Sequence, residues 1–158
     1  MYYDVIVLSG GFDPMHVGHL RMIQESAKMA EIVIVGVNSD EWLMRKKGYI
    51  FMPHEERVEM VQGTRGVSKA MAFDDDDNSA CDLLRRVRAL WPNFKVAFAN
   101  GGDRTSDNIP EMPVAKELGV HLIWGVGGGK IQSSSDLVDG LVGTSARMYS
   151  DKKEDESR

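Results

Sequence analysis

The chain has 158 residues, of which 42% are hydrophobic and 27% charged, and its formal net charge at pH 7 is −5. This length and apolar content suit one domain with a single core and exclude a second independent folding unit, so we expect one domain over residues 1–150 and a disordered charged tail over 151–158. The acidic balance argues against polymeric nucleic acid as a partner, because binding DNA or RNA usually requires a strongly basic surface.

Strand and helix patterns alternate from the N-terminus. Residues Tyr3 to Leu8 include three consecutive β-branched residues and stop at Ser9-Gly10-Gly11, which predicts a buried strand before a tight turn. From Val17 to Ala30 the apolar residues recur at helical spacing. Residues 32–37 form a nearly continuous apolar run, which is typical of a parallel strand covered on both faces. The first part of the chain is therefore predicted to be strand, helix, strand.

The alternation continues to the C-terminal part of the chain. Asn38-Ser39-Asp40 predicts the capped start of a short helix that ends near the basic loop 45–48, and Pro53 suits the first residue of the next helix. The remaining predicted elements are a strand over 69–73, a helix over 80–90 ended by Pro92, a strand over 95–99, a turn at 100–103, a helix over 114–118, a strand over 121–124, a glycine turn at 127–129 and a last helix capped by 133–135.

This alternation predicts a Rossmann-like α/β domain, an open parallel sheet with helices on both faces. Ligands of such sheets bind beyond the carboxyl ends of the strands. The glycine clusters at 10–11, 101–102 and 127–129 each follow a predicted strand. We therefore expect all three clusters to line one crevice.

The stretch from Gly10 to His19, with the sequence GGFDPMHVGH, carries the most chemical information. It follows the first strand and opens the first helix, where unpaired N–H groups and the helix dipole attract anions. His16 and His19 are three residues apart, which puts both rings on one helix face, and Gly18 between them has no side chain to block a ligand. The stretch therefore predicts a phosphate clamp.

This stretch resembles the H-x-G-H signature of the cytidylyltransferase-like nucleotidyltransferases, and the resemblance covers about residues 4–142. The later segments that fall in the order of that family are residues 37–41, 47–48, 56–57, 65, 101–103 and 133–135. Within the family, the sequence is most similar to the glycerol-3-phosphate cytidylyltransferases and to the nucleotidyltransferase domain of ADP-heptose synthases.

The resemblance implies roles for individual residues. His16, His19 and Lys47 would be the catalytic groups that hold the triphosphate and stabilise the transition state. The residues that the resemblance assigns to nucleotide binding are Gly10, Gly11, Phe12, Asp13, Gly18, Gly102, Asp103, Lys130, Ser133, Ser134 and Ser135. Those that it assigns to a substrate phosphate are Lys46, Arg57 and Arg65.

The implied reaction is attack by a phosphate oxygen of the acceptor on the α-phosphorus of CTP or ATP, with release of pyrophosphate. The acceptor would be a phosphorylated sugar, polyol or similar alcohol. Such a transfer depends on positioning and neutralisation of charge more than on covalent chemistry by the protein. A triphosphate-bound Mg²⁺ takes most of its ligands from phosphate and water, so we expect no dedicated metal ligands in the chain.

Some features leave alternatives open. The similar cytidylyltransferases have an arginine shortly before the Ser/Thr cluster, but this chain has Lys130 after three glycines, so we expect Lys130 to replace that arginine without its fork geometry. Pantetheine-phosphate adenylyltransferases share G-x-F-D-P and a serine triplet, which keeps an enzyme of that type as an alternative. His16 and the sequence Gly-Gly-Asp at 101–103 favour the sugar-phosphate or alcohol-phosphate group. A non-catalytic nucleotide sensor and a fragment of a class I tRNA synthetase are the other two alternatives.

Three further observations complete the expectations. Residues 74–77 are four aspartates, and because adjacent carboxylates repel each other we expect a solvated turn rather than a metal site. Cys81 is the only cysteine, which excludes an intrachain disulfide and predicts an inert thiol. The start of the chain lacks a signal-peptide pattern and no apolar run is long enough to span a membrane, so we expect a cytoplasmic protein without a membrane partner. A homodimer is implied by the resemblance alone.

Overall fold

The computed structural model describes residues 2–101 and 109–128. Gly102, Asp103, Lys130, the serine triplet 133–135 and the tail 151–158 lie outside these residues, so the expectations for them stay predictions.

Five parallel strands form one sheet in the order β3-β2-β1-β4-β5 within the described residues. The strands are β1 (Tyr3–Gly10), β2 (Ala30–Val37), β3 (Lys69–Met71), β4 (Val96–Gly101) and β5 (His121–Val126). The helices are α1 (Val17–Met29), α2 (Asp40–Lys47), α3 (His54–Gln62), α4 (Cys81–Leu90) and α5 (Met112–Leu118). The strand order reverses at β1, as in doubly wound folds, so the predicted Rossmann-like open parallel sheet is confirmed.

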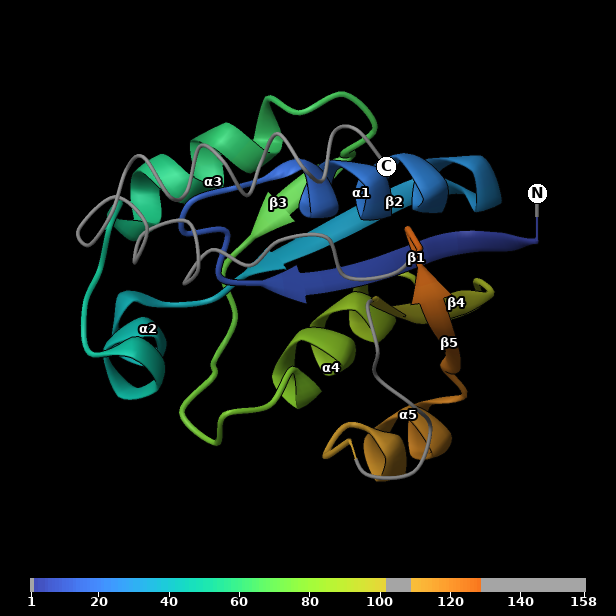
Figure 1. The fold of residues 1–158 in the computed structure, drawn as a ribbon. Helices are drawn as coiled ribbons and strands as arrows, with labels where there is room; N and C mark the ends of the chain where they lie inside the picture. The colour runs from blue at the N-terminus through green and yellow to red at the C-terminus, as the bar shows by residue number, and fades with distance from the viewer. Residues whose placement is uncertain (1, 102–108, 129–158) are drawn as a thin grey trace.

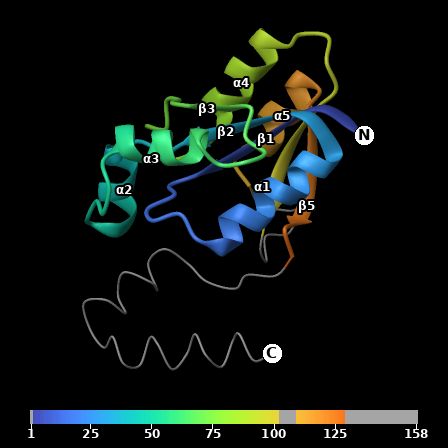
Figure 2. The same ribbon diagram turned by 90° about the horizontal axis from the view of Figure 1, so that it is seen from above.

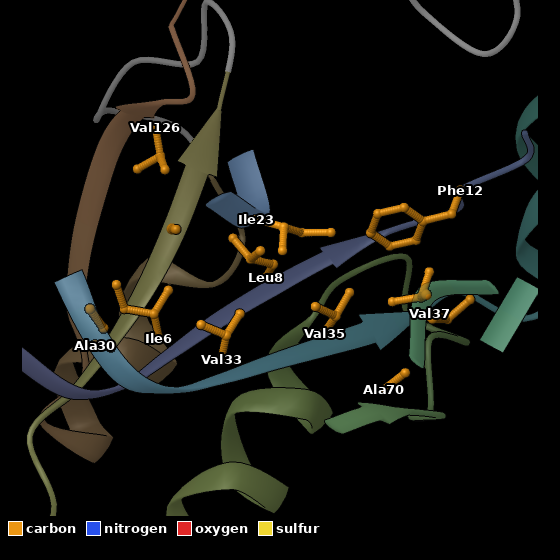
Figure 3. Packing of buried hydrophobic residues seen from close by; sticks show 13 residues of the cluster. Ile6, Leu8, Phe12, Ile23, Ala30, Val33, Val35, Val37, Ala70 and Val126 are labelled. Carbon is orange, nitrogen blue, oxygen red and sulfur yellow. The ribbon is translucent and has the colours of Figure 1, made fainter. Parts of the chain in front are cut away.

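The helices cover both faces of this sheet, with α1 and α3 on one face and α4 and α5 on the other (Figure 1). Figure 2, seen from above, shows the strands lying between α1 and α4. This layering follows from the period of two along a strand. Ile6 and Leu8 of β1 pack with Ile23 of α1 (Figure 3), whereas Val5 and Val7 belong to the cluster on the α4 face. Buried residues on both sides of β1 explain its continuous apolar run.

Most predicted elements are present, with shifts at their ends. Pro53 is the N-cap of α3 rather than its first residue, because its ψ of 157° is still extended. Helix α5 begins at Met112, two residues before the predicted start, and Pro113 suits the first turn of a helix because the N–H groups there need no intrahelical acceptor. None of the helices in the described residues combines the length and the apolar character that crossing a membrane requires.

The carboxyl ends of the strands carry the predicted glycine turns. A Cβ atom on Gly101 would lie 2.8 Å from Met22 Sδ, and one on Gly127 would lie 2.9 Å from the backbone nitrogen of Met22. At Gly127 only glycine allows this approach, because the contact is with backbone and φ is 85°, whereas at Gly101 the nearest atom belongs to the flexible end of the Met22 side chain. Gly101 and Gly127 therefore meet at α1, one turn after His19, whereas Gly10 at the end of β1 packs against the Phe12 ring.

Candidate active site

The turn between β1 and α1 is anchored in the core by Phe12. This residue has a φ of 52°, the left-handed region that a bulky side chain rarely adopts, and its side chain is buried. Figure 3 shows the ring beside Val37, and its centroid lies 4.7 Å from that of His19. Phe12 therefore packs against the His19 ring. The resemblance assigns Phe12 to the nucleotide, but the contacts in this structure are packing contacts.

The two histidines of the motif form one stacked pair. Their ring centroids are 3.8 Å apart and their planes differ by 25°. His16 is the N-cap of α1, and its Nδ1 accepts the N–H of Gly18 at 3.1 Å, while His19 Nδ1 accepts the N–H of His16 at 3.1 Å. A ring nitrogen that accepts a hydrogen bond carries no proton, so the proton of each ring is on Nε2. The expectation that both rings share one helix face is confirmed.

Gly18 makes this stacking possible. A Cβ atom at this position would lie 2.8 Å from His16 Cε1 and 3.0 Å from its Nδ1. The His16 ring therefore occupies the space that any other residue at position 18 would fill. In the structure Gly18 provides room for a catalytic candidate, and a contact of Gly18 with the ligand stays a prediction.

His19 is held in its neutral form. Burial, the neighbouring His16 and the charge of Lys47 together lower the pKa of His19 from 6.5 to about 3. At neutral pH the ring is therefore an uncharged donor through Nε2–H. Such a donor can stabilise developing negative charge on a phosphate without first having to gain a proton.

The lysines expected at the site lie in the last turn of α2. Lys47 Nζ donates a hydrogen bond to the carbonyl oxygen of Asp13 at 3.1 Å, and its charge contributes to the low pKa of His19. Lys46 Nζ lies 4.5 Å from the ring centroid of Trp42, a cation–π contact. The structure therefore brings Lys47 to the histidine pair, whereas Lys46 lies on the exposed face of the same helix end.

Asp13 does not offer its carboxylate to a ligand. The residue is fully buried, and its two carboxylate oxygens accept the N–H groups of Phe51 and Met52 at 2.8 and 2.7 Å. The Asp13 carboxylate is therefore not available to a ligand, and a contact of the Asp13 backbone with the nucleotide stays a prediction. Its role is to fix the segment between α2 and α3 against the motif turn.

Arg57 also has a different role from the expected one. Its exposed fraction is 0%, and its guanidinium donates to the carbonyl oxygens of Met52, Gly11 and Asn38 at 2.7 to 2.9 Å and to Asp40 Oδ1 at 2.7 Å. A buried guanidinium occupied in this way cannot contact a substrate phosphate, so that expectation is wrong. Arg57 instead ties the motif turn, the end of β2 and the start of α3 together.

Arg65, the third residue expected to meet a phosphate, is exposed in the turn between α3 and β3. Thr64 Oγ1 in this turn contacts Met15 Sδ at 3.6 Å. The turn therefore lies against the residue that precedes His16. A phosphate contact for Arg65 is compatible with this position and stays a prediction.

The acidic turn at 74–77 is only partly the solvated turn that we expected. Asp74, Asp76 and Asp77 are exposed, but Asp75 is 2% exposed. Its carboxylate accepts the Asn38 amide at 3.0 Å and the Ser39 N–H and hydroxyl at 2.8 and 2.7 Å. The expectation is therefore wrong for Asp75. No group of three or more His, Cys, Asp or Glu side chains suited to holding a metal ion gathers in residues 2–101 and 109–128.

Two of the residues that build the site were not found by sequence reasoning, namely Asp40 and Asp75. Asp75 lies 36 residues from Ser39, and no local pattern in the sequence connects the two. For Arg57 a signal did exist, because it lies four residues before the buried Val61 and thus on the buried face of α3. The same spacing would have predicted a buried arginine that needs an acidic partner.

Cys81 is the first residue of α4. Its thiol is buried near the start of α4, and Sγ lies 3.7 Å from the carbonyl oxygen of Pro110. The expected lack of reactivity of this thiol stays a prediction.

Comparisons with known proteins agree with this fold. The model of the family described as cytidylyltransferase-like matches residues 7–123. Bifunctional protein HldE of Syntrophotalea carbinolica is 30% identical over 138 residues, which cover 86% of this chain and 24% of that protein. HldE of Gluconobacter oxydans is 30% identical over 144 residues, covering 87% of this chain and 27% of that protein. The chain thus spans about a quarter of the length of these relatives.

Solved structures share the fold at lower sequence identity. A lipopolysaccharide core biosynthesis protein from Thermoplasma volcanium has a TM-score of 0.61 and 21% identity, with 81% of this chain and 99% of that chain covered. A bifunctional NMN adenylyltransferase/ADP ribose pyrophosphatase from Francisella tularensis, complexed with AMP and a manganese ion, has a TM-score of 0.57 and 18% identity, with 84% and 39% covered. The family match over residues 7–123 shows that the chain belongs to the cytidylyltransferase-like family of nucleotidyltransferases.

Proposed function

We propose that this protein transfers CMP or AMP from a nucleoside triphosphate to a phosphorylated sugar, polyol or similar alcohol and releases pyrophosphate. The observation that carries the proposal is the histidine pair: two stacked imidazoles at the N-terminus of α1, each with its proton on Nε2. A helix N-terminus attracts phosphate, and the two rings add directed donors at the same place.

The transfer is an in-line displacement. A phosphate oxygen of the acceptor forms a bond to the α-phosphorus, the bond from that phosphorus to the bridging oxygen breaks, and pyrophosphate leaves with the electron pair. The acceptor phosphate is already an anion, so the protein needs no general base. The neutral His19, with His16 and the ammonium of Lys47, stabilises the charge that develops on the phosphate chain. Lys46 and Arg65 would receive the acceptor's phosphate.

A divalent cation fits this site through the substrate. The carboxylate of Asp13, the acidic group within the motif, is bonded to two backbone N–H groups, so within the described motif turn the oxygens left for a cation are those of the triphosphate and water. Mg²⁺ bound there would neutralise triphosphate charge. Among the described residues, His16, His19 and Lys47 are those that would position the phosphate chain around the Mg²⁺ ion.

The choice of acceptor rests on resemblance. The resemblance of the motif segments to the glycerol-3-phosphate cytidylyltransferases and to the ADP-heptose synthases supports a sugar or polyol phosphate, and two HldE proteins are 30% identical to this chain. His16 supports the same group, because the pantetheine-phosphate adenylyltransferases usually carry another polar residue at that position.

The test is an assay of pyrophosphate release with each of the four nucleoside triphosphates, Mg²⁺ and a panel of phosphorylated acceptors. We expect release with CTP or ATP together with one class of sugar or polyol phosphate. Release only with a phosphopantetheine acceptor would favour the pantetheine-type enzyme. Tight binding of nucleotide without pyrophosphate from any acceptor would contradict the proposal and favour a nucleotide sensor.

A further inference from the structure

The acidic turn between β3 and α4 contacts both ends of α2. At the N-terminus, Ser39 is the N-cap of α2, and its N–H and hydroxyl both donate to the Asp75 carboxylate. In the last turn, Arg45 donates to the carbonyl oxygen of Asp75 at 2.7 Å and to Asn78 Oδ1 at 3.1 Å. In Figure 1 the segment that leads from β3 to α4 passes beside α2. One turn therefore holds a whole helix by hydrogen bonds.

These polar contacts matter because hydrophobic packing anchors α2 weakly. Among the eight residues of α2 only Leu43 is buried. One buried leucine fixes the position of a short helix but leaves it able to rotate or tilt. The contacts with Asp75, Arg45 and Asn78 restrict those movements.

Asp75 is suited to this task as an anion. Burial raises its pKa, but the hydrogen bonds from the Ser39 N–H, the Ser39 hydroxyl and the Asn38 amide, together with the charge of Arg45, outweigh this and keep the pKa below its ordinary value of 3.8. The carboxylate is therefore ionised at neutral pH. Hydrogen bonds to an ionised acceptor are roughly twice as strong as those between neutral groups.

We propose that Asp75 is a positioning residue, which fixes α2 so that Lys47 in its last turn lies at the histidine pair. Asp75 holds the start of α2 through the N-cap Ser39 and its last turn through Arg45. Lys47 lies two residues after Arg45, and its ammonium donates to the carbonyl oxygen of Asp13. This inference rests on the proposed function, and it assigns a role to the buried member of the acidic turn.

The test is a double-mutant cycle between Asp75 and Lys47 with the steady-state pyrophosphate assay. Asp75→Asn keeps the shape but removes the charge, and we expect kcat to fall about tenfold with little change in KM, the scale of a slight misplacement of a catalytic group. In the Lys47→Ala background the same change should have no further effect on kcat. Asp76→Asn, an exposed neighbour, is the matched control and should retain wild-type kcat.

A merely structural role gives a different pattern. Asp75→Asn would then lower the melting temperature but reduce kcat by the same factor with and without Lys47, and that result would overturn the inference. If Asp75→Asn does not fold, Asn78→Gly provides the second variant, because Asn78 is exposed and its φ of 62° suits glycine. It removes one acceptor of Arg45, so we expect a smaller loss of kcat that again vanishes in Lys47→Ala.

Binding of inorganic pyrophosphate, measured by calorimetry, separates this inference from the proposed function. If the wild-type protein releases no pyrophosphate with any acceptor, the proposed function fails. The double-mutant cycle between Asp75 and Lys47 can still be carried out on the affinities of the variants for inorganic pyrophosphate. The inference predicts that Asp75→Asn weakens pyrophosphate binding only when Lys47 is present. Equal weakening in both backgrounds, or none in either, would overturn it.

Discussion

At the scale of single residues, the histidine pair combines two tasks that can be separated by mutation. His16 caps α1 through Nδ1 and is a candidate donor to phosphate through Nε2. Alanine at position 16 removes both functions, whereas asparagine is among the best N-cap residues but has no group at the position of Nε2. Stability and turnover should therefore respond differently to the two substitutions.

We predict that His16→Ala lowers the free energy of unfolding by about 1 kcal/mol, the usual cost of a lost cap, and lowers turnover at least about a hundredfold. His16→Asn should restore most of the stability and none of the turnover. His19→Ala should also lower turnover at least about a hundredfold, because it removes the second donor. Urea denaturation and the pyrophosphate assay measure the two effects. Wild-type turnover in either histidine variant would contradict the mechanism.

The low pKa of His19 predicts how stability depends on pH. The folded protein keeps His19 neutral down to about pH 3, whereas the unfolded chain binds a proton near the ordinary pKa of 6.5. The unfolded state therefore holds more protons between these values, and stability falls as the pH falls, by up to about 1.4 kcal/mol per pH unit. Asp75 contributes mainly at lower pH, because its depressed pKa gives stability that is present above 3.8 and is lost as the pH falls below that value, where the range overlaps the lower end of the His19 range.

The measurement is urea denaturation of the wild-type protein and of His19→Gln at several pH values between 4.5 and 6.5. The substitution removes the titrating ring, so we expect a shallower loss of stability toward low pH in the variant. Other titrating groups are common to both proteins and cancel in the comparison of slopes. Equal slopes would show that His19 titrates normally in the folded state.

At the scale of elements, the site depends on segments that are held by buried polar groups. Asp13 fixes the segment before α3 through two backbone N–H groups, and Arg57 joins the motif turn to β2 and α3. Each of these side chains bonds several backbone groups in segments that are distant from it in sequence. Removing one of them therefore affects loops that are distant in sequence.

We predict that Arg57→Met destabilises the protein by about 3 to 5 kcal/mol, the usual result of removing one partner from a buried charged network. Arg57→Lys should restore little, because a lysine cannot donate along all the directions of the guanidinium fork. Arg65→Met is the matched control: it should leave the unfolding midpoint unchanged and raise the KM for the acceptor. Chemical denaturation provides the comparison, and a stable Arg57→Lys variant would contradict the role assigned to Arg57.

The elements themselves were predictable from sequence where a local period determines them. The apolar run of β2 and the stripe of Leu83, Leu84 and Val87 on α4 gave the correct type of element at the correct place. The role of Asp75 was not predictable, because a run of aspartates looks the same whether or not one of them is buried. Its partners Asn38 and Ser39 come close only after β2 and β3 have paired.

At the scale of the whole molecule, the strand order explains why the site forms at the end of β1. With β1 in the middle of the sheet, the helices that follow β1 and β2 begin at the same edge, so the motif turn and α2 lie side by side. This much of the site follows from the sequence, since the motif and the alternation of strands and helices predict it. The division of the motif residues into donors and buried supports does not follow, because it depends on which carbonyl and N–H groups the finished fold leaves buried.

The central claim is that both imidazoles donate from Nε2 to the same phosphate chain. It can be tested most directly by nitrogen NMR of protein labelled at the histidine side chains, titrated with CTP or ATP in the presence of Mg²⁺. We predict that His16 and His19 both show a protonated Nε2 in the free protein, and that both Nε2 resonances shift together as the nucleotide saturates. Saturation with a shift of neither resonance, or of only one, would contradict the account.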